Sequence, residues 1–275
     1  MDATCTVGPV TIGGGRPLAI IAGPCVLESL ELGLEVGQRL RDACGKLGLT
    51  YVFKASFDKA NRSSVSSPRG PGLERGLDWL AQIGESLGTA ITTDIHDASQ
   101  AEPVAARVDL IQIPAFLCRQ TDLLAAAARA AVAHGRAVNV KKGQFLSPGE
   151  MVGPVAKLAE SGCSNVMLTE RGTFFGYHRL VNDFVGLGDL MELGPPVCFD
   201  ATHSTQLPGT GEQSGGRPER APLLAAAAVA AGVHALFIEV HPDPSSALSD
   251  SATVLDLGTA ESVLARAAAI YAALD

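Results

Sequence analysis

Short runs of consecutive apolar residues alternate along the chain with longer segments in which apolar positions recur every three or four residues. The short runs are rich in β-branched residues or end in turn-forming residues, as buried strands do, and the longer segments have the period of amphipathic helices. The runs fall at residues 18–21, 51–53, 90–93, 110–113, 137–140, 165–168, 197–199 and 236–238. Segments of helical periodicity follow them near residues 28–47, 72–87, 97–106, 119–134, 148–160, 178–191, 218–231 and 258–274. The pattern therefore predicts eight successive strand and helix units.

Eight units in 275 residues leave about 34 residues for each, which is the size of one strand, one helix and their connections. Each predicted strand is continuously apolar rather than alternating, so both of its faces are expected to be covered. We interpret the chain as an α/β protein that forms one (β/α)₈ TIM barrel domain over residues 1–275. Residues 7–10 and 11–12 lie in an N-terminal cap of residues 1–17 and are expected to form a short β-hairpin that closes the barrel floor.

One uncharged stretch, residues 221–238, approaches the length of a membrane span. It is mostly alanine, contains Gly232 and His234 and leads directly into Glu239, so it is interpreted as a buried helix followed by a buried strand. The N-terminal residues lack the basic and apolar regions of a secretory signal, and no membrane association is expected. The six cysteines include no Cys-x-x-Cys pair, which favours reduced thiols in a cytoplasmic protein.

The overall charge narrows the range of partners. Charged residues make up 18% of the chain, against about 25% in an ordinary soluble domain, and 21 basic and 29 acidic residues give a net charge of −8. This balance argues against nucleic acid as a partner. It is compatible with a local anion-binding pocket, because a few basic groups in a cleft can reverse the sign of the field there.

In a (β/α)₈ barrel the active site is built at the carboxyl ends of the strands, so the residues just after each apolar run are the candidates. Four of the six lysines in the chain follow the second and fifth runs: Lys54, Lys59, Lys141 and Lys142. Together with Arg62 and Arg171 they predict a basic mouth that binds phosphorylated or carboxylated substrates. The alternative is that they form salt bridges with Asp58, Asp94 and Glu170.

Four residues after the first, seventh and eighth runs carry groups that bind metals: Cys25, His203, Glu239 and Asp250. Closure of a barrel makes its first and last strands neighbours, so these residues are expected to meet. A thiolate, an imidazole and two carboxylates suit Fe(II), Zn or Mn. Spacing alone also fits a core cysteine and a hydrogen-bonded histidine.

The glycine-rich segment 207–217 is either a mobile lid over the mouth or a passive connector.

Nine longer motifs occur in one order along the chain: GPCVLES (23–29), YVFKASFDKANRSS (51–64), TDIHD (93–97), IQIPAFLCRQTD (111–122), NVKKGQF (139–145), LTERGTFFGY (168–177), FDATHSTQLPG (199–209), SGGRPE (214–219) and FIEVHPDPSSALSD (237–250). Through these motifs, residues 16–270 resemble the 3-deoxy-D-manno-octulosonate 8-phosphate (KDO 8-phosphate) synthase family. The resemblance implies a (β/α)₈ barrel, a homotetramer, and condensation of phosphoenolpyruvate with D-arabinose 5-phosphate and water. The products would be KDO 8-phosphate and phosphate, in KDO and lipopolysaccharide biosynthesis.

Two positions refine this resemblance. Relatives that use erythrose 4-phosphate typically read Lys-Pro-Arg-Thr where residues 59–63 of this chain read Lys-Ala-Asn-Arg-Ser, the form of the arabinose 5-phosphate enzymes. Metal-independent members have asparagine at the position of Cys25. The resemblance therefore implies the metal-dependent class, in which Cys25, His203, Glu239 and Asp250 bind a divalent ion, Mn, Fe(II), Zn or Co.

The resemblance also implies roles for single residues. The groups around phosphoenolpyruvate would be Lys59, Lys141, Arg171 and His203, with Lys54 as a further lysine of that site. The arabinose 5-phosphate contacts would be Asn61, Arg62, Ser63, Asp94 and Gln144, and Arg119 would reach the pentose phosphate from a neighbouring subunit. The expected catalytic residues are Lys59, Lys141, His203 and Asp250, with His203 as a proton carrier and Asp250 or Glu239 as a base. The resemblance assigns no role to Arg217 and Arg220.

Two other functions are consistent with the same residues. One is a related phosphoenolpyruvate aldolase that uses another aldose and makes a seven-carbon or sialic-type acid. The other is a catalytically silent barrel that binds sugar phosphates as a sensor or an assembly subunit. Release of phosphate from phosphoenolpyruvate in the presence of different aldoses separates the three.

Overall fold

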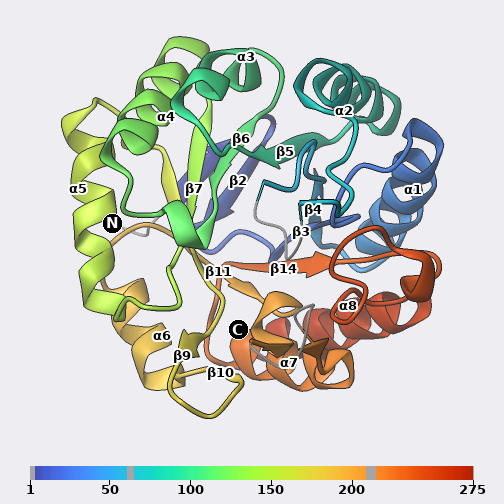
Figure 1. Ribbon diagram of the computed structural model, residues 1–275. Helices are drawn as coiled ribbons and strands as arrows, with labels where there is room; N and C mark the ends of the chain where they lie inside the picture. Colours follow the sequence, from blue (N-terminus) through green and yellow to red (C-terminus); the bar gives the residue numbers. More distant parts are fainter. Residues whose placement is uncertain (1–3, 61–64, 209–214, 275) are drawn as a thin grey trace.

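The computed structural model describes residues 4–60, 65–208 and 215–274. Eight parallel strands close into a barrel in the order β3 (Ala19–Gly23), β4 (Thr50–Lys54), β5 (Ala90–Asp94), β6 (Leu110–Ile113), β7 (Ala137–Lys141), β8 (Val166–Glu170), β11 (Val197–Asp200) and β14 (Ala235–Glu239). Figure 1 looks along the barrel, with the strands in the centre and the helices around them. The predicted (β/α)₈ architecture is confirmed, since each of the eight apolar runs falls on one barrel strand.

The helices around the barrel are α1 (Leu30–Lys46), α2 (Leu73–Leu87), α3 (Ala101–Ala105), α4 (Thr121–His134), α5 (Val152–Glu160), α6 (Phe184–Met191), α7 (Ala221–Ala230) and α8 (Leu257–Tyr271). Short 3₁₀ turns lie in the connections: η1 (Ala98–Gln100), η2 (Ala115–Leu117), η3 (Pro148–Met151), η4 (His203–Thr205), η5 (Pro218–Arg220) and η6 (Pro244–Ser246). Helix residues such as Leu40 and Leu80 pack against outward-facing strand residues such as Ile20. The main core therefore lies between the strands and the helices, which explains why the strands are apolar throughout.

The prediction of a helix over residues 178–191 was wrong in its first part. α6 begins just after Asp183, whose side chain accepts a hydrogen bond from the backbone N–H of Val185 and caps the helix. The residues before it form a small antiparallel hairpin of β9 (Thr173–Phe174) and β10 (Leu180–Val181). Gly176 and His178 in its turn have φ angles of 73° and 51°. This left-handed backbone conformation is incompatible with a continuing right-handed helix.

An antiparallel hairpin of β1 (Thr4–Val7) and β2 (Val10–Gly13) precedes the barrel. The hairpin is confirmed, but its strands differ from the predicted 7–10 and 11–12 because the chain turns at Gly8, which has a φ of 53°. Its side chains Cys5, Val7 and Ile12 are fully buried and pack with inward-facing strand residues. The hairpin thus closes the amino-terminal end of the barrel.

The inside of the barrel changes from apolar to charged along the strands. Small and apolar side chains lie next to the hairpin. By contrast, the last residues of six strands are charged: Lys54, Asp94, Lys141, Glu170, Asp200 and Glu239. All six are buried. Because parallel strands of a barrel end at the same rim, the fold gathers these groups at the carboxyl-terminal end.

The uncharged stretch 221–238 divides into α7 and β14, as the sequence predicted. Across the described residues, none of the helices combines the length and the apolar character needed to cross a membrane.

Replacement of Gly23 by alanine is expected to destabilise the protein by about 3 kcal/mol or more, because a Cβ there would lie 2.0 Å from the carbonyl oxygen of Lys54. The two backbones belong to neighbouring barrel strands and cannot separate without opening the sheet. Gly45→Ala is the matched control, since Gly45 lies in α1 with open space at its Cβ position. Alanine there should leave stability unchanged or raise it by up to about 1 kcal/mol. Denaturant unfolding measures both variants, and a Gly23→Ala protein of wild-type stability would contradict this reasoning.

Candidate active site

A cavity of about 480 Å³ opens at the carboxyl ends of the barrel strands. Its size lies within the range of small-molecule sites, roughly 300–1,000 Å³. Nine of the predicted site residues line it: Lys54, Lys59, Asp94, Lys141, Gln144, Arg171, His203, Glu239 and Asp250. The structure therefore brings together side chains from across the sequence, as the strand-end argument predicted.

Four other predicted residues are placed differently. Asn61, Arg62 and Ser63 lie outside the described residues. Arg119 is exposed beyond η2, does not line the cavity, and accepts a hydrogen bond through its carbonyl oxygen from Lys157 Nζ at 2.9 Å. The role expected for Arg119 stays a prediction.

Arg217 and Arg220 do not line the cavity. Both face Glu219, at 3.2 Å from Arg217 Nε and 3.8 Å from Arg220 Nε. These contacts are partly or fully solvent-exposed, and exposed ion pairs of this kind contribute little to stability.

The buried lysines are paired with carboxylates. Lys54 forms an ion pair with Glu239 and donates to the carbonyl oxygen of Cys25 at 3.0 Å. Lys141 Nζ donates to Asp200 Oδ2 at 2.6 Å. The prediction that the lysines give a simply basic mouth is thus incomplete, because much of their charge is balanced within the protein.

Of the predicted alternative pairs between the lysines and Asp58, Asp94 or Glu170, the described residues include the pair of Lys142 and Glu170. Lys142 Nζ lies 3.5 Å from Glu170 Oε2, and this lysine does not line the cavity. The expectation that it contributes to the mouth was wrong, because its ammonium group is buried against Glu170 and Thr173. Asp58 instead pairs with Arg69.

Asp200, which sequence reasoning did not assign a role, connects two of the predicted catalytic residues. Its Oδ2 contacts Lys141 Nζ and also His203 Nδ1, the latter at 2.8 Å. Its Oδ1 accepts from the backbone N–H of His203 at 2.9 Å. Burial alone would raise the pKa of Asp200, but His203 and Lys141 hold it well below its usual value. The ionised carboxylate therefore fixes the side chains of Lys141 and His203. The position of Asp200 at the end of a predicted strand was the feature of the sequence that could have identified it as a site residue.

A second polar group surrounds Asp94. Ser56 Oγ donates to Asp94 Oδ1 at 2.5 Å, and His96 Nε2 lies 2.9 Å from Asp94 Oδ2. Lys59 Nζ donates to Ser56 Oγ at 3.1 Å. Burial opposes ionisation of Asp94, yet the hydrogen bond and charge of His96 keep its pKa below the usual value. Ser56 and His96 line the cavity and were not predicted as site residues.

Two of the buried lysines lie over the aromatic ring of Phe237. Lys141 Nζ lies 3.5 Å from the centre of the Phe237 ring, and Lys54 Nζ lies 5.3 Å from it. Both ammonium groups are within the distance at which a cation is attracted to an aromatic face. Burial lowers the pKa of Lys141, against the opposing effect of Asp200.

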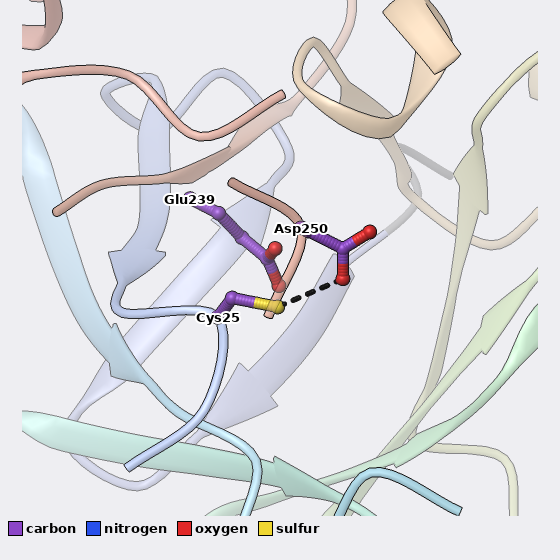
Figure 2. Close-up of side chains that lie close together, drawn as sticks. All are labelled: Cys25, Glu239 and Asp250. Carbon is purple, nitrogen blue, oxygen red and sulfur yellow. Dashed lines mark hydrogen bonds between the residues drawn. The ribbon is translucent and has the colours of Figure 1, made fainter. Parts of the chain in front are cut away.

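The predicted metal-binding residues meet at one side of the cavity. The ligand atoms of Cys25, Glu239 and Asp250 lie within 4.8 Å of one another, and Figure 2 shows the three side chains converging. Cys25 Sγ donates to Asp250 Oδ2 at 3.0 Å. His203 borders this group, with its Nε2 3.4 Å from Glu239 Oε2. Asp250 has a φ of 51°, a strained conformation for a residue with a side chain and typical of functional positions.

These residues fit a divalent metal ion of intermediate softness. Glu239 Oε2 is buried without a hydrogen-bond donor among the described residues, so it is available as a ligand. A thiol, two carboxylates and a neighbouring imidazole are the ligands expected for Zn, Fe(II) or related ions. Burial, with the charges of Asp250 and Glu239, raises the pKa of Cys25 well above its usual value. The thiol therefore keeps its proton in the metal-free protein, and ligation would replace that proton.

Several buried polar atoms that border the cavity have no hydrogen-bond partner among the described residues: His96 Nδ1, Gln144 Oε1, Arg171 Nη1 and Glu239 Oε2. Unpaired buried polar atoms are costly and uncommon in folded proteins. The other terminal nitrogen of Arg171 donates to Gln206 Oε1 at 2.6 Å, so the guanidinium is held with one nitrogen left for a ligand. The cavity is thus prepared for a polar ligand, with Arg171 Nη1 available to a negatively charged group and Gln144 Oε1 to a hydrogen-bond donor.

Comparison with known proteins agrees with this geometry. The DAHP synthetase I family matches residues 2–270. A relative from Cyanothece sp. is 52% identical over 266 residues, which cover 96% of each chain. Relatives from Desulfotalea psychrophila (51% identity, 97% of this chain and 94% of the relative) and Syntrophotalea carbinolica (52% identity, 99% and 97%) are similarly close. All three are named 2-dehydro-3-deoxyphosphooctonate aldolase.

Proposed function

The chain belongs to the DAHP synthetase I family, and from this membership and the geometry of the cavity we propose that it is a KDO 8-phosphate synthase. The enzyme condenses phosphoenolpyruvate with D-arabinose 5-phosphate and water and releases KDO 8-phosphate and phosphate. The observation that carries this function is the set of unpaired buried polar atoms around Arg171 and Gln144, in a chain about half identical to the named relatives over nearly its whole length.

Phosphoenolpyruvate binds on the side of the cavity that holds Lys59, Lys141 and Arg171, with Lys54 behind them and His203 beside them. Arg171 Nη1 and the lysine ammonium groups hold its phosphate and carboxylate, because charge-assisted hydrogen bonds in a buried site are strong and directional. The pairing of Lys141 with Asp200 and of Lys54 with Glu239 fixes both lysines before substrate arrives. This arrangement orients the substrate with little reorganisation.

D-arabinose 5-phosphate binds on the side of Asp94 and Gln144. Asp94 is fixed by Ser56 and His96 and accepts hydroxyl groups of the pentose, while Gln144 Oε1 takes a further donor. The family motif at residues 59–63 supports three further pentose contacts in this part of the site, with the phosphate bound by the last two: Asn61, Arg62 and Ser63. Arg119, exposed on its own subunit, reaches the same phosphate in a neighbouring subunit of a homotetramer.

The reaction joins C3 of phosphoenolpyruvate to C1 of the pentose, whose carbonyl oxygen takes a proton. Water adds to C2 and loses one proton. The bond from C2 to the phosphate oxygen then breaks while the new C2 hydroxyl passes its proton to the leaving phosphate, which gives a C2 ketone and inorganic phosphate. Asp200 holds His203 through Nδ1, so Nε2 serves either for proton transfer near phosphoenolpyruvate or, when a metal ion is bound, as its ligand, but not for both at once. Asp250 or Glu239 accepts the proton that the water loses.

A divalent metal ion, Mn, Fe(II), Zn or Co, is held by Cys25, Glu239 and Asp250, with His203 as the fourth ligand. When bound, it supplies Lewis-acid activation of the pentose aldehyde or of the water. The close approach of the three ligand atoms and the chemistry of the donor set support this assignment.

The product supplies KDO and lipopolysaccharide biosynthesis, and the enzyme acts in the cytoplasm. All six cysteines are buried and free of disulfide bonds, which fits a reducing compartment.

The function is tested by phosphate release from phosphoenolpyruvate with a panel of aldoses: arabinose 5-phosphate, erythrose 4-phosphate and N-acetylmannosamine. We expect one phosphate per KDO 8-phosphate formed, with a kcat/KM for arabinose 5-phosphate at least about 100-fold above the others, because the site is built to hydrogen-bond that sugar. A higher value for another aldose would identify a related aldolase. Binding of both substrates without phosphate release would identify a catalytically silent barrel.

A further inference from the structure

Two adjacent lysines at the end of β7 have different surroundings. Lys141 is the last residue of the strand and its ammonium group lies over Phe237 inside the barrel. Lys142 follows it directly, is 0% exposed and does not line the cavity. A buried ammonium group without a role in binding substrate needs another explanation, because its removal from water is costly.

The ammonium group of Lys142 joins two separate segments of the chain. On one side it donates to the carbonyl oxygens of Leu146 at 3.1 Å and Gly143 at 3.4 Å. On the other side it donates to Thr173 Oγ1 at 3.0 Å and faces Glu170 Oε2 at 3.5 Å. One side chain thus holds the segment after β7 against the segment after β8.

Glu170, which faces Lys142, also binds the backbone at Arg171. Its second oxygen, Oε1, accepts hydrogen bonds from the backbone N–H groups of Arg171 at 2.9 Å and Gly172 at 2.6 Å. The backbone N–H of Phe174 donates to the carbonyl oxygen of Gln144 at 2.9 Å, which links the same two segments again. The two segments therefore place Gln144 and Arg171, whose side chains have unpaired polar atoms at the cavity.

We propose that Lys142 is a positioning residue that, together with Glu170, sets the distance between Gln144 and Arg171 and so aligns the two substrates. The inference rests on the proposed function, in which Arg171 binds phosphoenolpyruvate and Gln144 binds the pentose. The hydrogen bonds of Lys142 act on both segments at once. Its loss lets the two binding groups move relative to each other, which weakens the binding of both substrates.

The test compares Lys142→Met with the double variant Lys142→Met/Glu170→Gln. Lys142→Met should raise KM for each substrate at least tenfold and also lower the midpoint of denaturant unfolding, since it leaves the Glu170 charge buried and unpaired. The double variant removes that charge and should recover most of the unfolding midpoint. Its KM values should remain at least fivefold above wild type, because the contacts to Leu146 and Thr173 are still missing. Recovery of KM together with stability would show a purely structural role and overturn the proposal.

Arg136→Met is the matched control at the opposite end of β7. Arg136 Nη1 pairs with Asp109 Oδ1 at 2.9 Å, away from the cavity, so this variant should lose stability with KM unchanged. If Lys142→Met does not fold, Thr173→Val removes one hydrogen bond of the same ammonium group and should raise both KM values about threefold; unchanged values would overturn the proposal.

The wild-type enzyme is measured in the same assay, so that failure of the proposed function can be told from failure of the proposed role of Lys142. Absence of phosphate release by the wild type would refute the proposed function, whereas an active wild type with unaffected variants would refute only the role of Lys142.

Discussion

Asp200→Asn is expected to lower kcat/KM for phosphoenolpyruvate by about 10³-fold while the protein remains folded. The carboxylate of Asp200 contacts Lys141 Nζ and His203 Nδ1 through one oxygen, so it fixes two residues of the phosphoenolpyruvate side at once. An amide has the same shape but no charge, and if its oxygen occupies the Oδ2 position, its NH₂ group faces the backbone N–H of His203, which is also a donor. His203 would lose the bond that sets its ring orientation, and Lys141 would lose its counter-charge in a buried site.

Steady-state phosphate release measures this effect, and circular dichroism verifies the fold. Asp109→Asn is a suitable control, because Asp109 also forms an ion pair, with Arg136, but does so at the other end of the barrel. It should change stability and leave kcat/KM within about twofold of wild type. A fall of less than tenfold in Asp200→Asn would mean that Asp200 does not organise the catalytic groups.

Removal of metal is expected to have an effect of comparable size. Treatment with a chelator should lower the rate of phosphate release at least about 100-fold, and Mn, Fe(II), Co or Zn should restore it. Cys25→Ala removes one of the three converging ligands and should reduce the metal retained after dialysis, as measured by elemental analysis of the protein. The metal content gives a readout that does not depend on activity.

Cys44→Ala serves as the control for the metal experiment. Cys44 is buried in α1, within the core between helices and strands, and should affect stability without changing metal content. Full turnover by exhaustively metal-free enzyme, or undiminished metal retention by Cys25→Ala, would show that Cys25, Glu239 and Asp250 are not a metal site.

The barrel and nine of the residues that line the cavity could be predicted from the sequence because both follow from strand geometry. Continuous apolar runs indicate strands covered on two faces, and parallel strands place Lys54, Asp94 and Glu239 at one rim regardless of side-chain detail. The same reasoning located Cys25 beside Asp250, since closure of the barrel joins its first and last strands.

The sequence did not predict the pairing among these groups, which depends on which way each side chain points. Lys142 is adjacent to Lys141, yet it does not line the cavity and pairs with Glu170. Asp200 was visible at a strand end, but its contact with both Lys141 and His203 depends on rotamers and on the backbone turn after β11. Ser56 and His96 became site residues only through their contacts with Asp94, for which the sequence offers no pattern.

The hairpin of β1 and β2 determines from which side the reaction is supplied with water. Cys5, Val7 and Ile12 fill the amino-terminal end of the barrel, and Phe237 separates that apolar plug from the charged groups above it. Water that reacts at C2 therefore enters from the same side as the two substrates. Once both are bound, their own bulk slows exchange of that water with the solvent. Oxygen-isotope labelling of the bulk solvent after the substrates have bound should then reach the product more slowly than labelling before they bind.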